Sequence, residues 1–146
     1  MARSASLYLY AEQRNIDVDW FPLARADSLS IPLGNEIYGI AIDPKKIKSE
    51  ADETVKLAHE LGHCSTGAFY NRLATCDIRQ KHEHRADKWA IKKLIPVDEL
   101  DEAVAAGHTE LWDLADYFGV TEEFMKKAVC WYTHGNLATD LYFSTN

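Results

Sequence analysis

The chain has 146 residues, of which 47% are hydrophobic and 11% aromatic, enough to build one well-filled core and too apolar for a disordered chain. It carries 23 acidic against 16 basic residues, and the resulting net charge of −7 argues against direct binding to nucleic acids or to anionic membranes. Its apolar runs are too short to span a bilayer or to form a signal-peptide core, so we expect a cytoplasmic protein.

The number and spacing of the cysteines are consistent with a reducing cytoplasm. Cys64, Cys76 and Cys130 are an odd number and include no CxxC pair, so they predict reduced thiols and not a disulfide framework. We expect each of them to be a small buried side chain.

The N-terminal third predicts one helix and a small sheet. Apolar residues recur at helical spacing between positions 4 and 15. The segment from Tyr38 to Ile42 is aromatic and β-branched, and Asp43-Pro44 ends it, which predicts a strand. We expect it to pair with an earlier strand near Ile31 and Leu33.

The rest of the chain is typical of helices. The predicted segments are 52–66, 79–94, 97–106, 108–118 and 121–132. Acidic residues stand at the start of the first segment, Pro96 stops the second, and Thr121 is a typical N-cap of the last. The pattern predicts a single α+β domain over residues 1–146, mostly helical, with a small N-terminal sheet.

The most informative motif is His59-Glu60-Leu61-Gly62-His63, an H-E-x-x-H on a predicted helix. Residues four apart lie on one helix face, so both imidazoles can reach one metal ion. Glu60 falls about 100° around the helix from His59, where it can act as a base toward water without ligating the metal.

The opposite face of this helix supports the interpretation. Leu57, Leu61, Cys64 and Ala68 form an apolar stripe that points away from the histidines. The alternative is a surface helix on which the two histidines are simply hydrogen-bonded.

A catalytic zinc needs a third protein ligand and one open position. The continuation H-E-x-x-H-x-x-G-x-x-H is excluded, because Thr66 and Phe69 stand where it needs glycine and histidine. The other route supplies a glutamate from the next helix, and Glu83 follows His63 after nineteen intervening residues.

The helix around Glu83 has a suitable face. Asp87, Ala90 and Leu94 lie on the side of Glu83, and small Ala86 allows the helices to approach closely. We expect Asp87 to accept a hydrogen bond from the outer N–H of a ligating histidine, although it could be only a surface charge. His82 and His84 flank Glu83 and compete for the ligand role, but on a helix all three cannot face one ion.

These segments resemble a known family. Residues 56–63, 83–90 and 94–96 match, position by position, the pattern of the ImmA/IrrE metallopeptidases: an AHELGH helix, then E-x-x-A-[ND]-x-[FW]-A, then an aliphatic pair and proline. More weakly, 39–42 resembles the family's preceding strand and 112–123 its LA..F.V(S/T) segment, so the resemblance covers about residues 36–132.

The resemblance implies a zincin-like domain whose sheet packs on the H-E-x-x-H helix. It implies that His59, His63 and Glu83 ligate Zn²⁺ and that Glu60 is the catalytic glutamate. It also implies a function, the cleavage of a transcriptional repressor that belongs to a phage, a mobile element or a stress system.

Several features of the expected reaction stay open in the sequence. The oxyanion of the reaction needs a donor, and the candidates are Tyr70, His82, His84, His108 and His134. We expect the substrate to add as a strand to a sheet edge formed by Gly39, Ile40, Ala41 and Ile42. Manganese or another divalent ion could replace zinc.

Two other functions compete with a peptidase. The first is a zinc-binding regulatory or toxin-like partner of a repressor that has no turnover, against which the intact Glu60 argues. The second is a DNA-binding helix pair over residues 112–128, against which the acidic charge argues. The oligomeric state is open.

Overall fold

The sheet of the computed structural model, which describes residues 3–70 and 73–143, has three strands in the order β1-β3-β2. They are β1 (Ile16–Trp20), β2 (Ser28–Gly34) and β3 (Ile37–Ile42). Strand β3 runs parallel to β1 and antiparallel to β2, and Ile31 lies opposite Gly39. The predicted strand and its earlier partner are therefore both present.

The position of β3 corrects one prediction. Residues 39–42 do not form a sheet edge, because β1 pairs with β3 on the side away from β2. The sequence analysis missed β1, although Ile16 to Trp20 alternates apolar and acidic residues with a period of two. A peptide cannot pair with a strand that is flanked on both sides. Among the strands of residues 3–70 and 73–143, those with an open edge are therefore β1 and β2.

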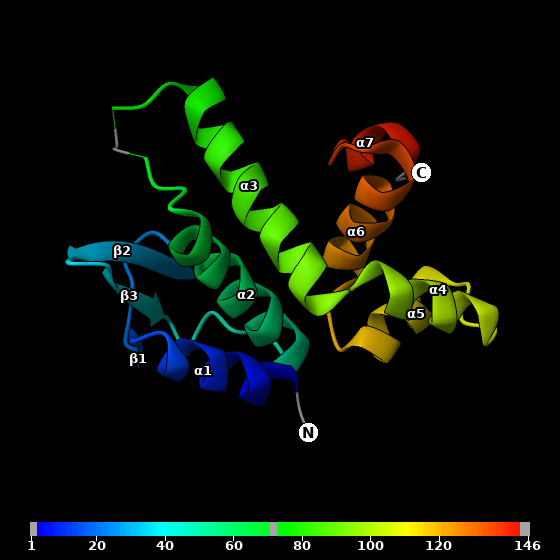
Figure 1. Cartoon of the computed structure of the whole chain (residues 1–146), viewed down its shortest axis with the longest axis horizontal. Coiled ribbons are helices and arrows are strands. Elements are labelled where there is room, and N and C mark those ends of the chain that lie inside the picture. Colours follow the sequence, from blue (N-terminus) through cyan, green and yellow to red (C-terminus); the bar gives the residue numbers. More distant parts are fainter. Residues whose placement is uncertain (1–2, 71–72, 144–146) are drawn as a thin grey trace.

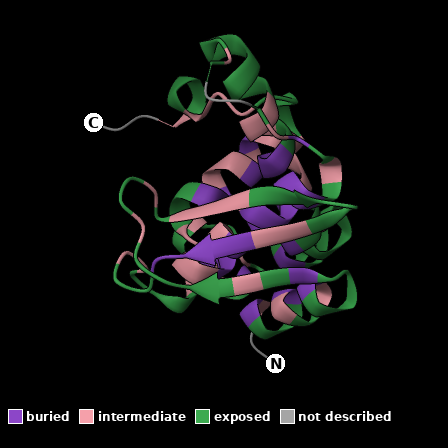
Figure 2. Ribbon diagram, turned by 90° about the vertical axis from the view of Figure 1, so that its left-hand side faces the viewer, coloured by how far each residue is buried: buried purple, intermediate pink, exposed green. Residues whose placement is uncertain are grey.

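Two helices cover one face of the sheet. Helix α1 (Arg3–Gln13) and helix α2 (Glu50–Thr66) lie behind the strands in Figure 2, which looks onto the other face of the sheet. Ile40 and Ile42 of β3 are buried against Leu57 and Leu61 of α2 in one core. Ser49 caps the first turn of α2 by accepting from the amide of Asp52, and Gly67 ends the helix in the left-handed region.

Helix α3 (Cys76–Leu94) crosses α2 at very short range (Figure 1). A Cβ added at Gly62 of α2 would lie 2.5 Å from the carbonyl oxygen of Ala86, so only glycine permits this approach. Helix α3 begins three residues earlier than predicted, because Thr75 accepts from the amide of Ile78 and caps it.

The remaining helices gather at the end of the molecule away from the sheet (Figure 1). They are α4 (Val97–Ala105), α5 (Leu111–Phe118), α6 (Glu122–His134) and the short α7 (Thr139–Tyr142), which the sequence analysis did not predict. Thr121 caps α6 as expected. The predicted helix at 108–118 begins only at Leu111. In the described residues, no helix has the length and apolarity that crossing a membrane requires.

The cysteines follow the prediction only in part. Cys64 and Cys130 are free and buried, and Cys76 is free and exposed. The difference arises because Cys76 is the first residue of α3, at the end of the helix that extends away from the core.

Candidate metal centre

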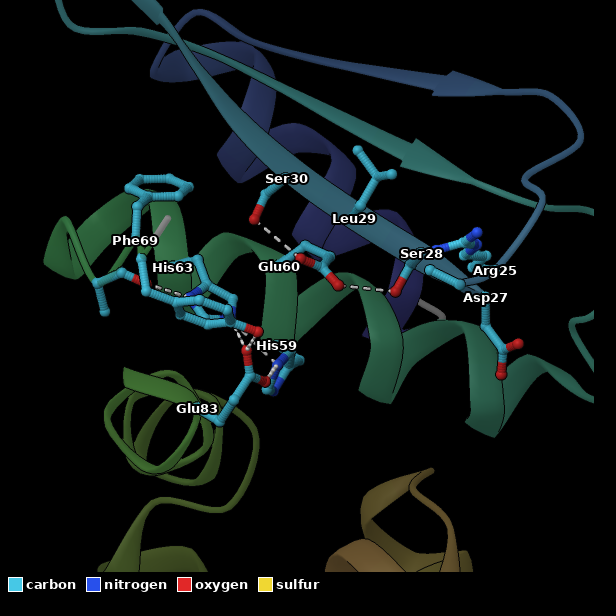
Figure 3. A pocket seen from close by; sticks show the side chains of 13 residues that line it. Arg25, Asp27, Ser28, Leu29, Ser30, His59, Glu60, His63, Phe69 and Glu83 are labelled. Atoms are coloured by element: carbon cyan, nitrogen blue, oxygen red, sulfur yellow. Dashed lines mark hydrogen bonds and ion pairs between the residues drawn. The ribbon is translucent and has the colours of Figure 1, made fainter. Parts of the chain in front are cut away.

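Helices α2 and α3 bring three side chains of metal-ligating type together. Nε2 of His59 lies 2.7 Å from Oε2 of Glu83, and Nε2 of His63 lies 3.1 Å from Oε1 of Glu83. The two Nε2 atoms are 3.2 Å apart (Figure 3). The predicted spacing therefore places both histidines on one face of α2, with the Glu83 carboxylate opposite them.

The outer nitrogen of each imidazole is held by an acceptor. Nδ1 of His59 donates to Oδ1 of Asp87 over 2.7 Å, and Nδ1 of His63 donates to the carbonyl oxygen of Ala68. Asp87 thus lies where the sequence predicted, and it is oriented by Nζ of Lys127 on α6, 3.1 Å from its other oxygen. These bonds turn both Nε2 atoms toward Glu83.

The donor set fits a zinc ion. Two ligands that each lie about 2.1 Å from a tetrahedral ion are about 3.4 Å apart. The two Nε2 atoms lie 3.2 Å apart, and one ligand atom from each of the three residues lies within 4.8 Å of the other two. Two imidazoles and one carboxylate are also a typical catalytic zinc set that leaves a fourth position open. Geometry and chemistry therefore agree, and His59, His63 and Glu83 could hold the metal.

The electrostatics show that this position favours positive charge. Burial lowers the pKa of His59, but hydrogen bonds to Asp87 and Glu83 outweigh it and raise that pKa to about 10. Burial raises the pKa of Glu83, and hydrogen bonds from His59 and His63 reverse this and hold it well below its usual range. The carboxylates of Asp87 and Glu83 thus stabilise a positive charge at His59, where a bound cation would also be stabilised.

Glu60 lies beside this cluster and is held by strand β2. The hydroxyl of Ser28 donates to Oε2 of Glu60 and the hydroxyl of Ser30 to Oε1, each over 2.8 Å (Figure 3). The Glu60 residue is only 6% exposed. The sequence analysis missed both serines; the available signal was polar residues at alternate positions of a strand.

A cavity of about 650 Å³ opens over the cluster. Its lining includes Ser28, Leu29 and Ser30 of the open-edged strand β2, together with Phe69 and Tyr70 from the segment after α2. Glu60 and the three residues of the metal cluster complete its floor. The cavity therefore lies between the unpaired edge strand β2 and the candidate metal ligands.

The predicted oxyanion or substrate donors lie in different places. Tyr70 lines the cavity, and its hydroxyl donates to Oε1 of Glu83 over 3.0 Å. His84 lines a neighbouring hollow between α2, α3 and α6, and His82 packs near the Tyr70 ring but lines neither space.

The other two histidines are engaged elsewhere. His108 pairs with Asp113, and His134 stacks on Tyr142. Neither lines the cavity, so Tyr70 is the one predicted donor that the structure brings to it.

Comparison with known proteins agrees with this geometry. The model of the family described as Peptidase_M78, IrrE N-terminal-like domain, matches residues 11–129. A search of curated proteins found no significant match. The matched range contains the H-E-x-x-H helix, Glu83 and all three strands. The chain therefore belongs to the ImmA/IrrE family of metallopeptidases.

Proposed function

We propose that the protein is a zinc-dependent metalloendopeptidase. The observation that carries this proposal is the convergence of the His59, His63 and Glu83 ligand atoms beside the buried Glu60 carboxylate, all at the floor of one cavity. Zinc held by these three residues would acidify a water molecule and polarise a substrate carbonyl. Membership of a metallopeptidase family supports the proposal.

Three side chains around the cavity have separate roles in the proposed reaction. Glu60 accepts a proton from the attacking water and later donates it to the leaving amine. Asp87 keeps the His59 ring in the tautomer that leaves Nε2 free. The hydroxyl of Tyr70 donates a hydrogen bond to the oxyanion that develops on the substrate. Its place in the cavity wall and its hydrogen bond to Glu83 support this role.

The substrate binds as an extended strand along β2 and not along residues 39–42. Strand β2 has an open edge, and its residues 28–30 line the cavity above the metal cluster. Main-chain hydrogen bonds at such an edge fix the direction and register of a bound peptide, and they do not depend on the identity of its side chains. The scissile bond would thereby lie over the metal cluster.

The physiological substrate in this proposal is a transcriptional repressor of a phage, a mobile element or a stress system. The family resemblance supports this partner, and the acidic net charge of −7 favours a protein over a nucleic acid. The three free cysteines fit a reducing cytoplasm as the place of action.

The experiment compares zinc-loaded wild type with Glu60→Gln. Both proteins are incubated with each transcriptional repressor whose gene lies near that of this protein and with a mixture of proteome-derived peptides. The products are identified by mass spectrometry. We expect equal zinc content in both proteins and cleavage by the wild type alone, because only the base is lost. Equal cleavage by Glu60→Gln would refute the role of Glu60. A wild type that binds zinc and the repressor but cleaves nothing would instead indicate a non-catalytic partner protein.

A further inference from the structure

Strand β2 places polar residues on the covered face of the sheet and apolar residues on the exposed face, the reverse of the usual arrangement. Ser28 and Ser30 lie opposite Ile42 and Ile40 of β3, and so point to the helix-covered face of the sheet. Apolar Ile31 and Leu33 remain 48% and 54% exposed. A strand selected for stability alone would place its apolar residues on the covered face. Two inward serines therefore call for another explanation.

Their contact with Glu60 supplies that explanation. Each serine hydroxyl donates to a different oxygen of the Glu60 carboxylate, both over 2.8 Å. A carboxylate buried to this extent needs donors, and two donors on separate oxygens fix both its position and its rotation. Each oxygen keeps a further acceptor site, so the carboxylate can still receive a proton from water.

We propose that Ser28 and Ser30 are positioning residues that hold the Glu60 carboxylate at the floor of the cavity. The inference rests on the proposed function, since it assigns these serines to the base of that reaction. Strand β2 then has two tasks: its open edge aligns the peptide and its inward hydroxyls align the base. A single rigid element thus sets the position of the substrate relative to Glu60.

The test uses two matched double variants, Ser28→Thr/Ser30→Thr and Ser28→Val/Ser30→Val. Threonine and valine have nearly the same shape and both favour strands, so the pair isolates the hydroxyl groups. Thermal melting of the metal-free proteins tests the contact without any substrate. We expect the valine variant to melt at least about 4 °C below the threonine variant, because it leaves a buried carboxylate without donors. In a Glu60→Leu background the valine variant should no longer melt below the threonine variant, because the threonine hydroxyls have lost the carboxylate that they bind.

The zinc-loaded proteins test the positioning itself. Acetohydroxamate is the probe, because it chelates zinc and places a hydroxyl where a neighbouring carboxylate can accept its proton. We expect about tenfold weaker binding of the probe to the valine variant than to the threonine variant, at equal zinc content. For any substrate identified, kcat of the valine variant should fall about 100-fold while KM changes less than about threefold.

The possible outcomes separate this inference from the proposed function. Equal melting of the valine and threonine variants, or equal probe affinity in the zinc-loaded proteins, would overturn the positioning role. A protein that binds no zinc would refute the proposed function and with it the role of the serines in catalysis. The melting comparison in metal-free protein would still show whether the Ser–Glu contact exists.

Discussion

Replacing Gly62 by alanine should push α2 and α3 apart and weaken the metal centre without touching a ligand. The new Cβ would lie 2.5 Å from the carbonyl oxygen of Ala86 and 3.0 Å from its Cα. These are backbone atoms, so no side-chain rotation can relieve the contact. Since His59 and His63 lie on α2 and Glu83 on α3, any separation of the helices widens the ligand cluster.

Two effects of opposite sign set the size of the change. Alanine in place of glycine stabilises a helix by about 0.8–1 kcal/mol. Overpacking a tight contact costs about 1–3 kcal/mol, and a contact with backbone belongs at the upper end of that range. We therefore expect Gly62→Ala to lower the free energy of unfolding by about 1–2 kcal/mol. A shift of ligands by a few tenths of an ångström should weaken zinc binding at least about tenfold.

The assay combines urea unfolding of the metal-free protein with zinc competition against a chelator. Gly39→Ala is the matched control, because its new Cβ meets no backbone and contacts only side-chain atoms, of Leu33 at 3.3 Å and of Ile31 at 3.8 Å. That variant should keep its zinc affinity. A Gly62→Ala protein as stable as the wild type, with the same zinc affinity, would refute the inference that the α2–α3 approach sets the ligand geometry.

Three further predictions concern other parts of the molecule. Asp87→Ala should weaken zinc binding about 10–100-fold, because the His59 ring loses the acceptor that orients it. Competition with a chelator measures this loss, and an unchanged zinc affinity would contradict the role of Asp87. Zinc affinity should rise with pH between 6 and 9, since the pKa of His59 is raised to about 10 and its proton must leave before Nε2 can bind the metal. Calorimetry in buffers of different ionisation enthalpy should detect the release of this proton. A zinc affinity that does not change with pH would contradict the raised pKa. In native protein at pH 8, the exposed Cys76 should react with a thiol reagent, whereas Cys64 should react only after unfolding. Burial and the nearby Glu60 charge raise the pKa of Cys64 to about 12. Fast reaction of two thiols would contradict a closed core.

Helical periodicity accounts for most of what the sequence predicted about the site. The four-residue spacing of His59 and His63 and the position of Glu83 on the next helix are local features, and the structure brings these residues together. Asp87, one turn beyond Glu83, also lies where the spacing placed it. In each case a helix fixes the direction of a side chain within a few residues.

The features that the sequence analysis missed depend on contacts between distant segments. The central position of β3 follows from its pairing with β1, twenty-two residues earlier in the register, which no local pattern determines. The inward direction of Ser28 depends on that same register and on the place of Glu60 in α2. Cys76 is exposed because Thr75 starts α3 early, so that its first turn extends beyond the core.

The most direct test of the proposed metal centre is elemental analysis of protein purified without a histidine tag. The samples are the wild type, Glu83→Ala, and Glu102→Ala, which replaces an exposed glutamate of α4 as the control. We predict about one zinc per chain in the wild type and in the control, and loss of that zinc in Glu83→Ala. A wild type that cannot be loaded with zinc, or a Glu83→Ala protein that retains it fully, would contradict the three-ligand site.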